Sequence, residues 1–99
     1  MTLSASTPTV LTGSATLENA VGLHARPSVK LTQLAKRFAA SIAFALAPEG
    51  PWTDAKSPVK VMRIKAPKGS VLYFNVTGTD AEEALAAVLG LVNDKFGEE

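Results

Sequence analysis

Residues 71–93 read VLYFNVTGTDAEEALAAVLGLVN, a stretch in which two different hydrophobic patterns meet. Apolar and polar residues alternate over residues 71–77, which predicts a strand with Leu72, Phe74 and Val76 facing inward. Over residues 81–93 the apolar positions recur every three or four residues, which is typical of an amphipathic helix. Residues 79–82 read TDAE, so we expect a capping box to open this helix.

The same two patterns recur upstream of this stretch. Alternation predicts strands over residues 14–18 and 41–46, the second with Ile42, Phe44 and Leu46 on one face, and a short strand over residues 52–56. We expect a helix over residues 26–38 and a second, short helix that is capped by Ser57 and ends near residue 64. The order βαββαβα predicts an α+β sandwich in which the helices cover one face of the sheet.

Length and composition exclude several classes of protein. Ninety-nine residues predict one domain, and we interpret residues 1–12, which are rich in Ser and Thr, as a flexible tail before a domain at 13–99. A net charge of +1 and 6% aromatic residues argue against nucleic-acid or acidic-membrane partners. The chain has no cysteine, no signal-peptide pattern and no apolar run near 18 residues, so we expect a cytoplasmic location and no membrane insertion.

Residues 22–28 read GLHARPS and contain the one histidine of the chain, directly before the first predicted helix. A helix N-terminus offers backbone N–H groups and the positive end of the helix dipole, and Arg26 adds a forked cation suited to phosphate. The imidazole of His24 could attack a phosphoryl group, and the helix end and Arg26 would then hold the dianion. We expect Gly22 to turn the backbone tightly and to keep space open beside the ring.

The spacing alone leaves a plainer interpretation open. His24 could be an N-cap or loop residue, with the side chain of Arg26 simply solvated. A metal site is not expected, because the chain has no second histidine and no cysteine. The nucleophile elbow G-x-S-x-G is absent, and a Ser-His-Asp triad cannot be identified from spacing.

Over about residues 14–94 the chain resembles the histidine-containing phosphocarrier (HPr) family of the bacterial phosphoenolpyruvate-dependent sugar phosphotransferase system. GLHARPS is similar to the active-site signature of that family. Lys36, the KS pair at 56–57 with Met62 after it, and KGS at 68–70 follow in the family's order. The resemblance implies an open-faced sandwich with a four-stranded antiparallel sheet, and a phosphocarrier that is not an enzyme and needs no cofactor.

The resemblance also implies a phosphoryl relay. Enzyme I would load the phosphoryl group onto Nδ1 of His24, and an enzyme II A-type domain would accept it during sugar uptake. Arg26 would assist the phosphoryl group, and Gly22 and Ala25 would form the loop around it. We expect a monomer.

The resemblance further implies that Lys36, Val59 and Met62 dock the partners, and that Ser57 is a candidate regulatory site for a serine kinase. Ordinary core packing remains the alternative for Val59 and Met62, and a solvated helix face remains the alternative for Lys36. If Ser57 only caps its helix, it needs no kinase.

The chain departs from the family pattern at several positions. Val21 stands where a polar residue is usual, Pro58 stands where an aliphatic residue is usual, and Lys65 stands where glycine commonly ends the second helix. Residues 47–52 carry an insertion with two prolines and Trp52. Two other functions stay open: an HPr-like regulatory module that controls a kinase or transcription regulator and would also keep His24, and an interaction domain with an incidental histidine.

Overall fold

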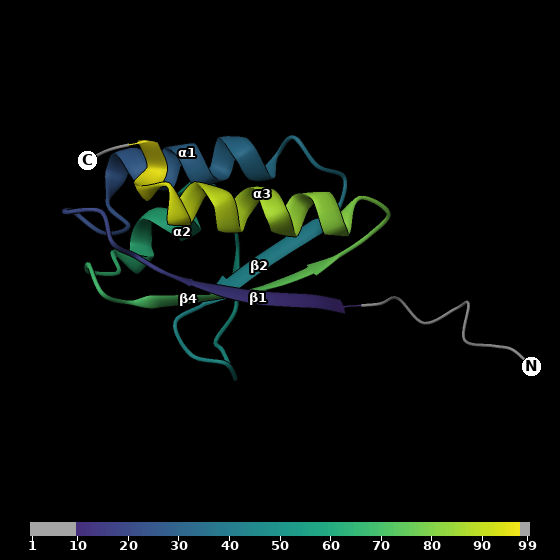
Figure 1. Ribbon diagram of the computed structural model, residues 1–99, viewed down its shortest axis with the longest axis horizontal. Helices are drawn as coiled ribbons and strands as arrows, with labels where there is room; N and C mark the ends of the chain where they lie inside the picture. The colour runs from purple at the N-terminus through teal and green to yellow at the C-terminus, as the bar shows by residue number, and fades with distance from the viewer. Residues whose placement is uncertain (1–9, 98–99) are drawn as a thin grey trace, which may run out of the picture.

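The computed structural model describes residues 10–97, and residues 1–9 and 98–99 lie outside this description. One four-stranded antiparallel sheet carries helices on one side, as Figure 1 shows. The elements are β1 (Val10–Thr16), α1 (Ala25–Ala35), β2 (Ser41–Ala45), β3 (Thr53–Asp54), α2 (Pro58–Ile64), β4 (Val71–Thr77), α3 (Ala81–Asn93) and a 3-10 turn (Lys95–Gly97). The chain thus runs in the predicted order βαββαβα, and the strands stand in the order β1-β4-β2-β3.

The strand that the sequence predicts most clearly, β4, stands between β1 and β2 and pairs with both of them. Its inward residues Leu72, Phe74 and Val76 are fully buried, which confirms the prediction. Phe74 lies opposite Phe44 of β2, and the two ring centroids are 6.0 Å apart. This separation is typical of a favourable aromatic pair, so the centre of the core lies where these two strands meet.

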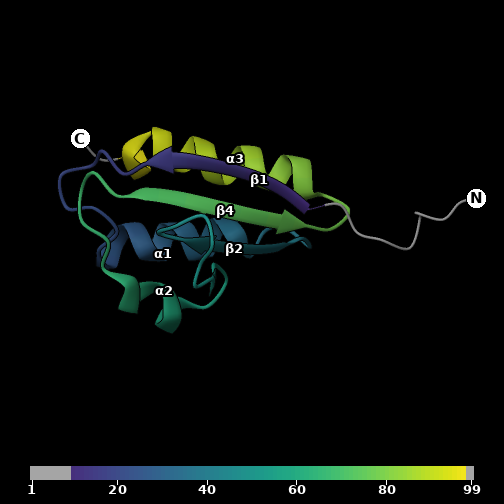
Figure 2. The same ribbon diagram turned by 90° about the horizontal axis from the view of Figure 1, so that it is seen from below.

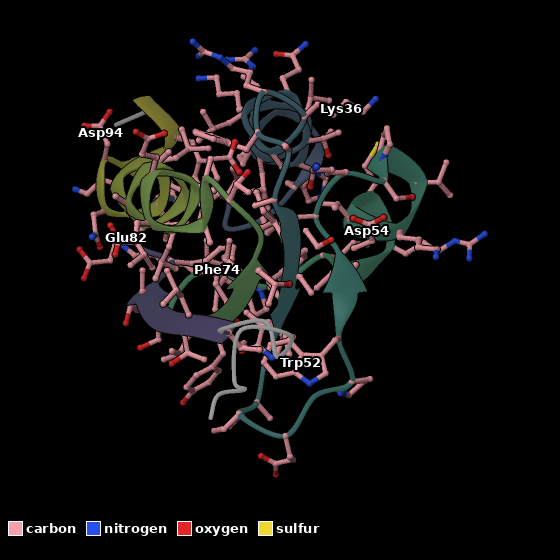
Figure 3. All side chains as sticks on the ribbon, turned by 90° about the vertical axis from the view of Figure 1, so that its right-hand side faces the viewer. Lys36, Trp52, Asp54, Phe74, Glu82 and Asp94 are labelled. Carbon is pink, nitrogen blue, oxygen red and sulfur yellow. The ribbon has the colours of Figure 1, made fainter. Side chains whose placement is uncertain are left out.

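The helices cover the sheet with the apolar faces that the sequence predicts. Ala84, Val88 and Val92 of α3 are fully buried, and so are Leu31 and Ala35 of α1. Figure 2 shows α3 along β1 and α1 along β2, with α2 beside α1. No helix of residues 10–97 lies on the opposite side of the sheet, and Trp52, in the loop between β2 and β3, lies on that side (Figure 3). Within residues 10–97, no helix is long and apolar enough to cross a membrane.

Several element boundaries differ from the predictions. β1 begins at Val10 and ends at Thr16, so residues 10–12 belong to the sheet and not to a tail. The prediction that Leu46 belongs to the second strand and shares a face with Ile42 and Phe44 is wrong, because β2 ends at Ala45, and the side chain of Leu46 is 45% exposed while those of Ile42 and Phe44 are buried. The first helix ends at Ala35 instead of residue 38, and the strand predicted at 52–56 has two residues. The strand boundaries depend on pairing with distant strands, which hydrophobic periodicity does not report. The helix ends early because its last turn tightens, with the N–H groups of Arg37 and Phe38 donating to the carbonyls of Leu34 and Ala35.

The predicted capping box at the start of α3 is also wrong. Asp80 occupies the N-cap position, and its side chain makes no capping hydrogen bond. Its two carboxylate oxygens instead accept hydrogen bonds from the backbone N–H groups of Ala39 (2.9 Å) and Ala40 (2.8 Å), just before β2. The bond from Ala39 is the main reason that the pKa of Asp80 lies below its ordinary value, while partial burial opposes this shift. The carboxylate thus ties the turn before α3 to the turn after α1.

Lys65, the residue directly after α2, adopts a left-handed conformation with φ 51° and ψ 42°. Left-handed backbone is unfavourable for residues with a Cβ, and glycine is the usual residue at this helix end. The sequence departure at this position therefore places a strained residue directly before Ala66.

We expect Asp80→Asn to lower the free energy of unfolding at neutral pH, because the amide loses the charge that strengthens both hydrogen bonds. The pKa of Asp80 is lowered in the folded state, so its contribution is fully present above about pH 4 and is lost as the pH falls through that lowered value. Thermal melts at neutral and acidic pH should show the gap between wild type and Asp80→Asn closing in acid. Glu49→Gln, in an exposed loop, is the control, and a gap of constant size would contradict the assignment.

We expect Lys65→Gly to stabilise the fold by about 0.5–1 kcal/mol. Relief of left-handed strain, about 1–2 kcal/mol, should exceed the extra unfolded-state entropy of glycine. Lys68→Gly is the matched control, since Lys68 does not have a positive φ, and it should lose about 0.4–1 kcal/mol. Urea denaturation measures both, and a destabilised Lys65→Gly variant would show that the lysine side chain, and not its backbone, determines the outcome.

Candidate functional site

The loop that precedes α1 is held by backbone hydrogen bonds to a second loop, between α2 and β4. At its start, Leu17 donates to the carbonyl of Ser70 (2.8 Å), and Gly69 donates to the carbonyl of Leu17 (2.7 Å). At its end, Leu23 donates to the carbonyl of Ala66 (2.8 Å). The side chains of Leu17 and Leu23 are fully buried. The residue that follows Leu23 is His24, so the histidine extends from a backbone that is fixed at both ends of its loop.

Gly22 is required where these two loops meet. Its φ is +66°, and a Cβ built on it would lie 2.4 Å from the carbonyl oxygen of Ala66 and 2.8 Å from the nitrogen of Lys68. The predicted tight turn at Gly22 is therefore confirmed. The three atoms nearest to that Cβ position belong to residues 66–68, so the space that glycine leaves is filled by that loop and not by the imidazole.

His24 occupies the N-cap position of α1 with extended backbone angles. Its carbonyl oxygen accepts a hydrogen bond from the backbone N–H of Ser28 at 2.9 Å, while its imidazole makes no capping hydrogen bond and is exposed. The N-cap position that the plainer interpretation gave to His24 is thus observed, although the imidazole takes no part in capping. The ring does not stabilise the helix end, and it stands at the surface.

The sequence-predicted residues His24, Ala25 and Arg26 lie together, because all three line one shallow hollow of ≈ 320 Å³ with Val21 and Pro27. The N–H groups of Ala25 and Arg26 come before the first bond within the helix, and they stand at the positive end of the α1 dipole. Backbone N–H groups, a guanidinium and an imidazole at a helix N-terminus form a suitable site for a small dianion. Gly22, which the resemblance placed in the phosphoryl-binding loop with Ala25, is buried and does not line this hollow.

The rim of the His24 hollow is apolar at Val21, and a second hollow elsewhere on the surface is acidic. Val21, where the resemblance leads us to expect a polar residue, is 55% exposed at the rim and offers no hydrogen bond from its side chain. A larger hollow of ≈ 450 Å³ lies at the start of α3, and Asp80, Glu82 and Glu83 are among its lining residues. These carboxylates would repel an anion, so the smaller hollow at His24 is the better phosphate site.

The residues predicted to dock partners are on the surface. Val59 is 61% exposed and Met62 is 42% exposed, so core packing is the wrong interpretation for both, and Val61 is the buried residue of α2. Lys36, at the C-cap of α1, is also exposed, which fits either a partner contact or a solvated position. Figure 3 shows Lys36 on the outer side of α1, at the end of the molecule that faces the viewer.

Helices α1 and α2 run antiparallel. The Leu23–Ala66 bond joins the start of α1 to the end of α2, and Lys56 Nζ, just before α2, donates to the carbonyl of Phe38, just after α1, at 2.7 Å. His24 therefore lies at one end of this helix pair, and Ser57, which opens α2, lies at the other. Neither helix contains an acidic residue, and their exposed or half-buried basic side chains are those of Arg26, Lys30, Lys60 and Arg63.

Ser57 is the N-cap of α2, as predicted. Its hydroxyl oxygen accepts a long hydrogen bond of 3.4 Å from the backbone N–H of Lys60, and Pro58 is the first residue of the helix. Proline has no N–H group to leave unpaired at this position, and its fixed φ suits a first turn. The helix ends at Ile64, also as predicted.

Sequence reasoning missed Asn19, which is fully buried in the loop that leads to His24. Its side-chain nitrogen Nδ2 donates to the carbonyl oxygen of Gly22 at 2.7 Å, and its own carbonyl oxygen accepts from the N–H of Gly22 at 3.1 Å. Asparagine followed three residues later by glycine is a turn pattern, so the sequence carried a signal for this contact.

The chain is similar in sequence to known phosphocarrier proteins. Residues 11–94 match the family described as "PTS HPr component phosphorylation site". A phosphocarrier protein HPr from Cupriavidus necator is 42% identical over 83 residues, and a phosphocarrier protein NPr from Escherichia coli is 36% identical over 83 residues. Each match covers 84% of this chain and 91% of the relative.

Solved structures show the same fold. HPr-C-His from Thermoanaerobacter tengcongensis superposes with a TM-score of 0.81 at 32% identity, over 90% of this chain and 98% of that one. An HPr from Bacillus anthracis gives a TM-score of 0.76 at 32% identity, over 84% and 96%. Members of this family are phosphocarriers and not catalysts, and their partners are phosphotransferase proteins such as Enzyme I and enzyme II A-type proteins. The chain, which carries an exposed histidine at a helix N-terminus within the same fold, belongs to the HPr family of phosphotransferase-system phosphocarriers.

Proposed function

We propose that this chain accepts a phosphoryl group from phosphorylated Enzyme I on Nδ1 of His24 and passes it to an enzyme II A-type acceptor during sugar uptake. The observation that carries this proposal is the exposed, uncapped imidazole of His24 in one hollow with Arg26 and the start of α1. A cytoplasmic, monomeric carrier is the expectation from the sequence and remains part of the proposal.

The chemistry follows from the contents of the hollow. A lone pair on the imidazole forms a new N–P bond as the bond between phosphorus and the donor breaks, and the reverse exchange later delivers the group to the acceptor. The phosphoryl oxygens then carry a dianion beside the N–H groups of Ala25 and Arg26 and near the guanidinium. Because the hollow is shallow and open, the product stays accessible to a second protein.

The exposed surface of α1 and α2 supports docking of two successive partners. Val59 and Met62 offer apolar contacts, Lys36, Lys60 and Arg63 are exposed on the same pair of helices, and neither helix contains an acidic residue. Such a surface favours partners that present acidic groups around an apolar centre. Donor and acceptor must both reach His24, so they are expected to use this same surface in turn.

A regulatory module is the second candidate, in which phosphorylation of His24 controls a kinase or transcription regulator. Val21, beside His24, and Pro58, in α2, depart from the family pattern and lie where a partner would bind. These two departures support a partner other than an enzyme II A-type acceptor. Proteins captured selectively by the phosphorylated form would distinguish a regulatory target from an enzyme II A-type acceptor.

Labelled phosphoenolpyruvate and Enzyme I from the same source should transfer label to the wild-type chain in an acid-labile, alkali-stable form, as expected for an N–P bond. His24→Ala should take up no label. Arg26→Ala should be labelled about 10- to 100-fold more slowly, which corresponds to the loss of a charged hydrogen bond worth about 1.5–3 kcal/mol. Its melting temperature should change little, because Arg26 is exposed.

Intact-mass spectrometry and autoradiography measure these transfers. Labelling of His24→Ala would show that another residue carries the phosphoryl group. A folded wild-type chain that takes no phosphate from Enzyme I would favour the interaction-domain interpretation instead.

We also propose that Ser57 is a candidate site for a serine kinase, and the variants Ser57→Asp and Ser57→Ala test what charge there would do. Aspartate can cap α2 and adds charge beside Val59, so we expect a near-wild-type melting temperature and phosphoryl transfer slowed several-fold by repulsion of acidic partner groups. Alanine should show the opposite: stability lower by about 1 kcal/mol and unchanged transfer. Equal transfer by both variants would leave Ser57 as a helix cap alone.

A further inference from the structure

The peptide group between Gly22 and Leu23 is fixed by hydrogen bonds on both of its sides. Its carbonyl oxygen accepts from Nδ2 of Asn19 at 2.7 Å, and its N–H donates to the carbonyl of Ala66 at 2.8 Å. The side chain of Leu23 is fully buried, and the next residue is His24. Only Leu23 separates this peptide group from His24. Its orientation therefore sets the direction in which the backbone enters His24, and with it the position of the imidazole.

Gly22 makes this peptide group easy to rotate. Glycine tolerates both signs of φ, and Gly22 already has a φ of +66°, so its backbone offers little resistance to a flip of the group that follows. A flip would withdraw the carbonyl from Asn19 and the N–H from Ala66 together. The close approach to residues 66–68 requires glycine here. Because glycine rotates easily, another group must hold the Gly22–Leu23 peptide group in place.

Asn19 is the one residue between positions 19 and 23 with a polar side chain, since the others are Ala20, Val21, Gly22 and Leu23. The orientation of its amide is determined by the contact, because the carbonyl oxygen of Gly22 needs a donor and only Nδ2 can supply one. Its Oδ1 is buried without a hydrogen-bond partner in the described residues. The hydrogen bond that Asn19 does make with its side chain is the one to the Gly22 carbonyl, in the segment that leads to His24.

We propose that Asn19 is a positioning residue for phosphoryl transfer, which holds the Gly22–Leu23 peptide group and thereby the starting position of His24. The inference rests on the proposed function, since it concerns the same histidine. Asn19 does not line the hollow and does not touch the phosphoryl group, so it acts through the backbone. Its side chain supplies a hydrogen bond that orients the loop. Val21, at the rim of the hollow, has no polar group in its side chain and cannot supply one.

The test uses the full chain, phosphorylated Enzyme I and three variants. Asn19→Ala removes the donor, and Asn19→Asp removes it with almost no change in shape. Thr32→Ala is the matched control, because Thr32 is also a buried polar residue, lies on α1 away from the loop, and has a hydroxyl with no partner in the described residues. Rapid-quench kinetics give kcat and KM for phosphoryl acceptance, and amide hydrogen exchange reports on the Leu23 N–H.

We expect both Asn19 variants to lower kcat about 10- to 100-fold, as a small misplacement of a reacting group does, with KM within about two-fold of wild type. The docking residues on α2 are untouched, which is why KM should hold. The Leu23 amide should exchange faster in both Asn19 variants. Thr32→Ala should match wild type in kcat and in Leu23 exchange even where its melting temperature falls.

Unchanged kcat in Asn19→Ala would overturn the proposal, and so would an equal loss in Thr32→Ala, which would make the effect one of stability. A wild-type chain that accepts no phosphate would refute the proposed function instead. Leu23 exchange then decides the inference by itself: faster exchange in Asn19→Asp supports the lock, and unchanged exchange overturns it.

Discussion

The hydrogen bond from Leu23 to Ala66 is the contact on which the arrangement of the site depends. It joins the loop that ends at His24 to the residue that follows α2, and so it sets the start of α1 beside the end of α2. A single hydrogen bond contributes only about 1 kcal/mol net. Its structural effect is larger than its energy, because it joins positions 43 apart in the sequence and fixes the end of the loop next to His24, whereas the two hydrogen bonds of Leu17 hold the other end.

This one contact imposes requirements on both loops. On one side, Gly22 must be glycine, since any Cβ would meet the Ala66 carbonyl. On the other side, the chain must turn sharply after α2, and Lys65 does so in a left-handed conformation that glycine would adopt more easily. The loops thus contain one residue without a side chain and one residue under strain. The first condition comes from the close approach of backbone to backbone and the second from the way the chain leaves α2, and neither involves the imidazole.

Elements whose signals are local could be predicted from the sequence. The bounds of β4 and α2 match the prediction, because alternation and a Ser-Pro cap are properties of adjacent residues. The start of β1 at Val10 could not be predicted, since residue 10 extends the strand only by pairing with Thr77. The contacts of Asp80 were also hidden, because its partners Ala39 and Ala40 lie far away in the chain. A capping box and a tertiary contact look alike in sequence.

The same distinction explains which parts of the site could be predicted. His24 and Arg26 belong to one short motif, so their proximity follows from the first turn of a helix, and the structure places them in one hollow. Exposure of Val59 and Met62 could not be decided from periodicity, because a helix of seven residues shows too few turns to define a buried face. Asn19 lay within reach of sequence reasoning, since its turn is local.

Exposed contacts on α1 and α2 and buried backbone contacts before His24 serve different needs of a carrier. His24 stands at one end of the α1–α2 pair, and the exposed apolar residues of α2 follow from it toward Ser57. Under the proposed function, a donor and an acceptor must both cover His24 and the same helices, so they exclude each other and must release the carrier between transfers. Small apolar contacts and exposed charges suit this need, because they associate quickly and separate quickly. The rigidity that transfer requires is placed instead behind the histidine, in buried backbone contacts that no partner has to form or break.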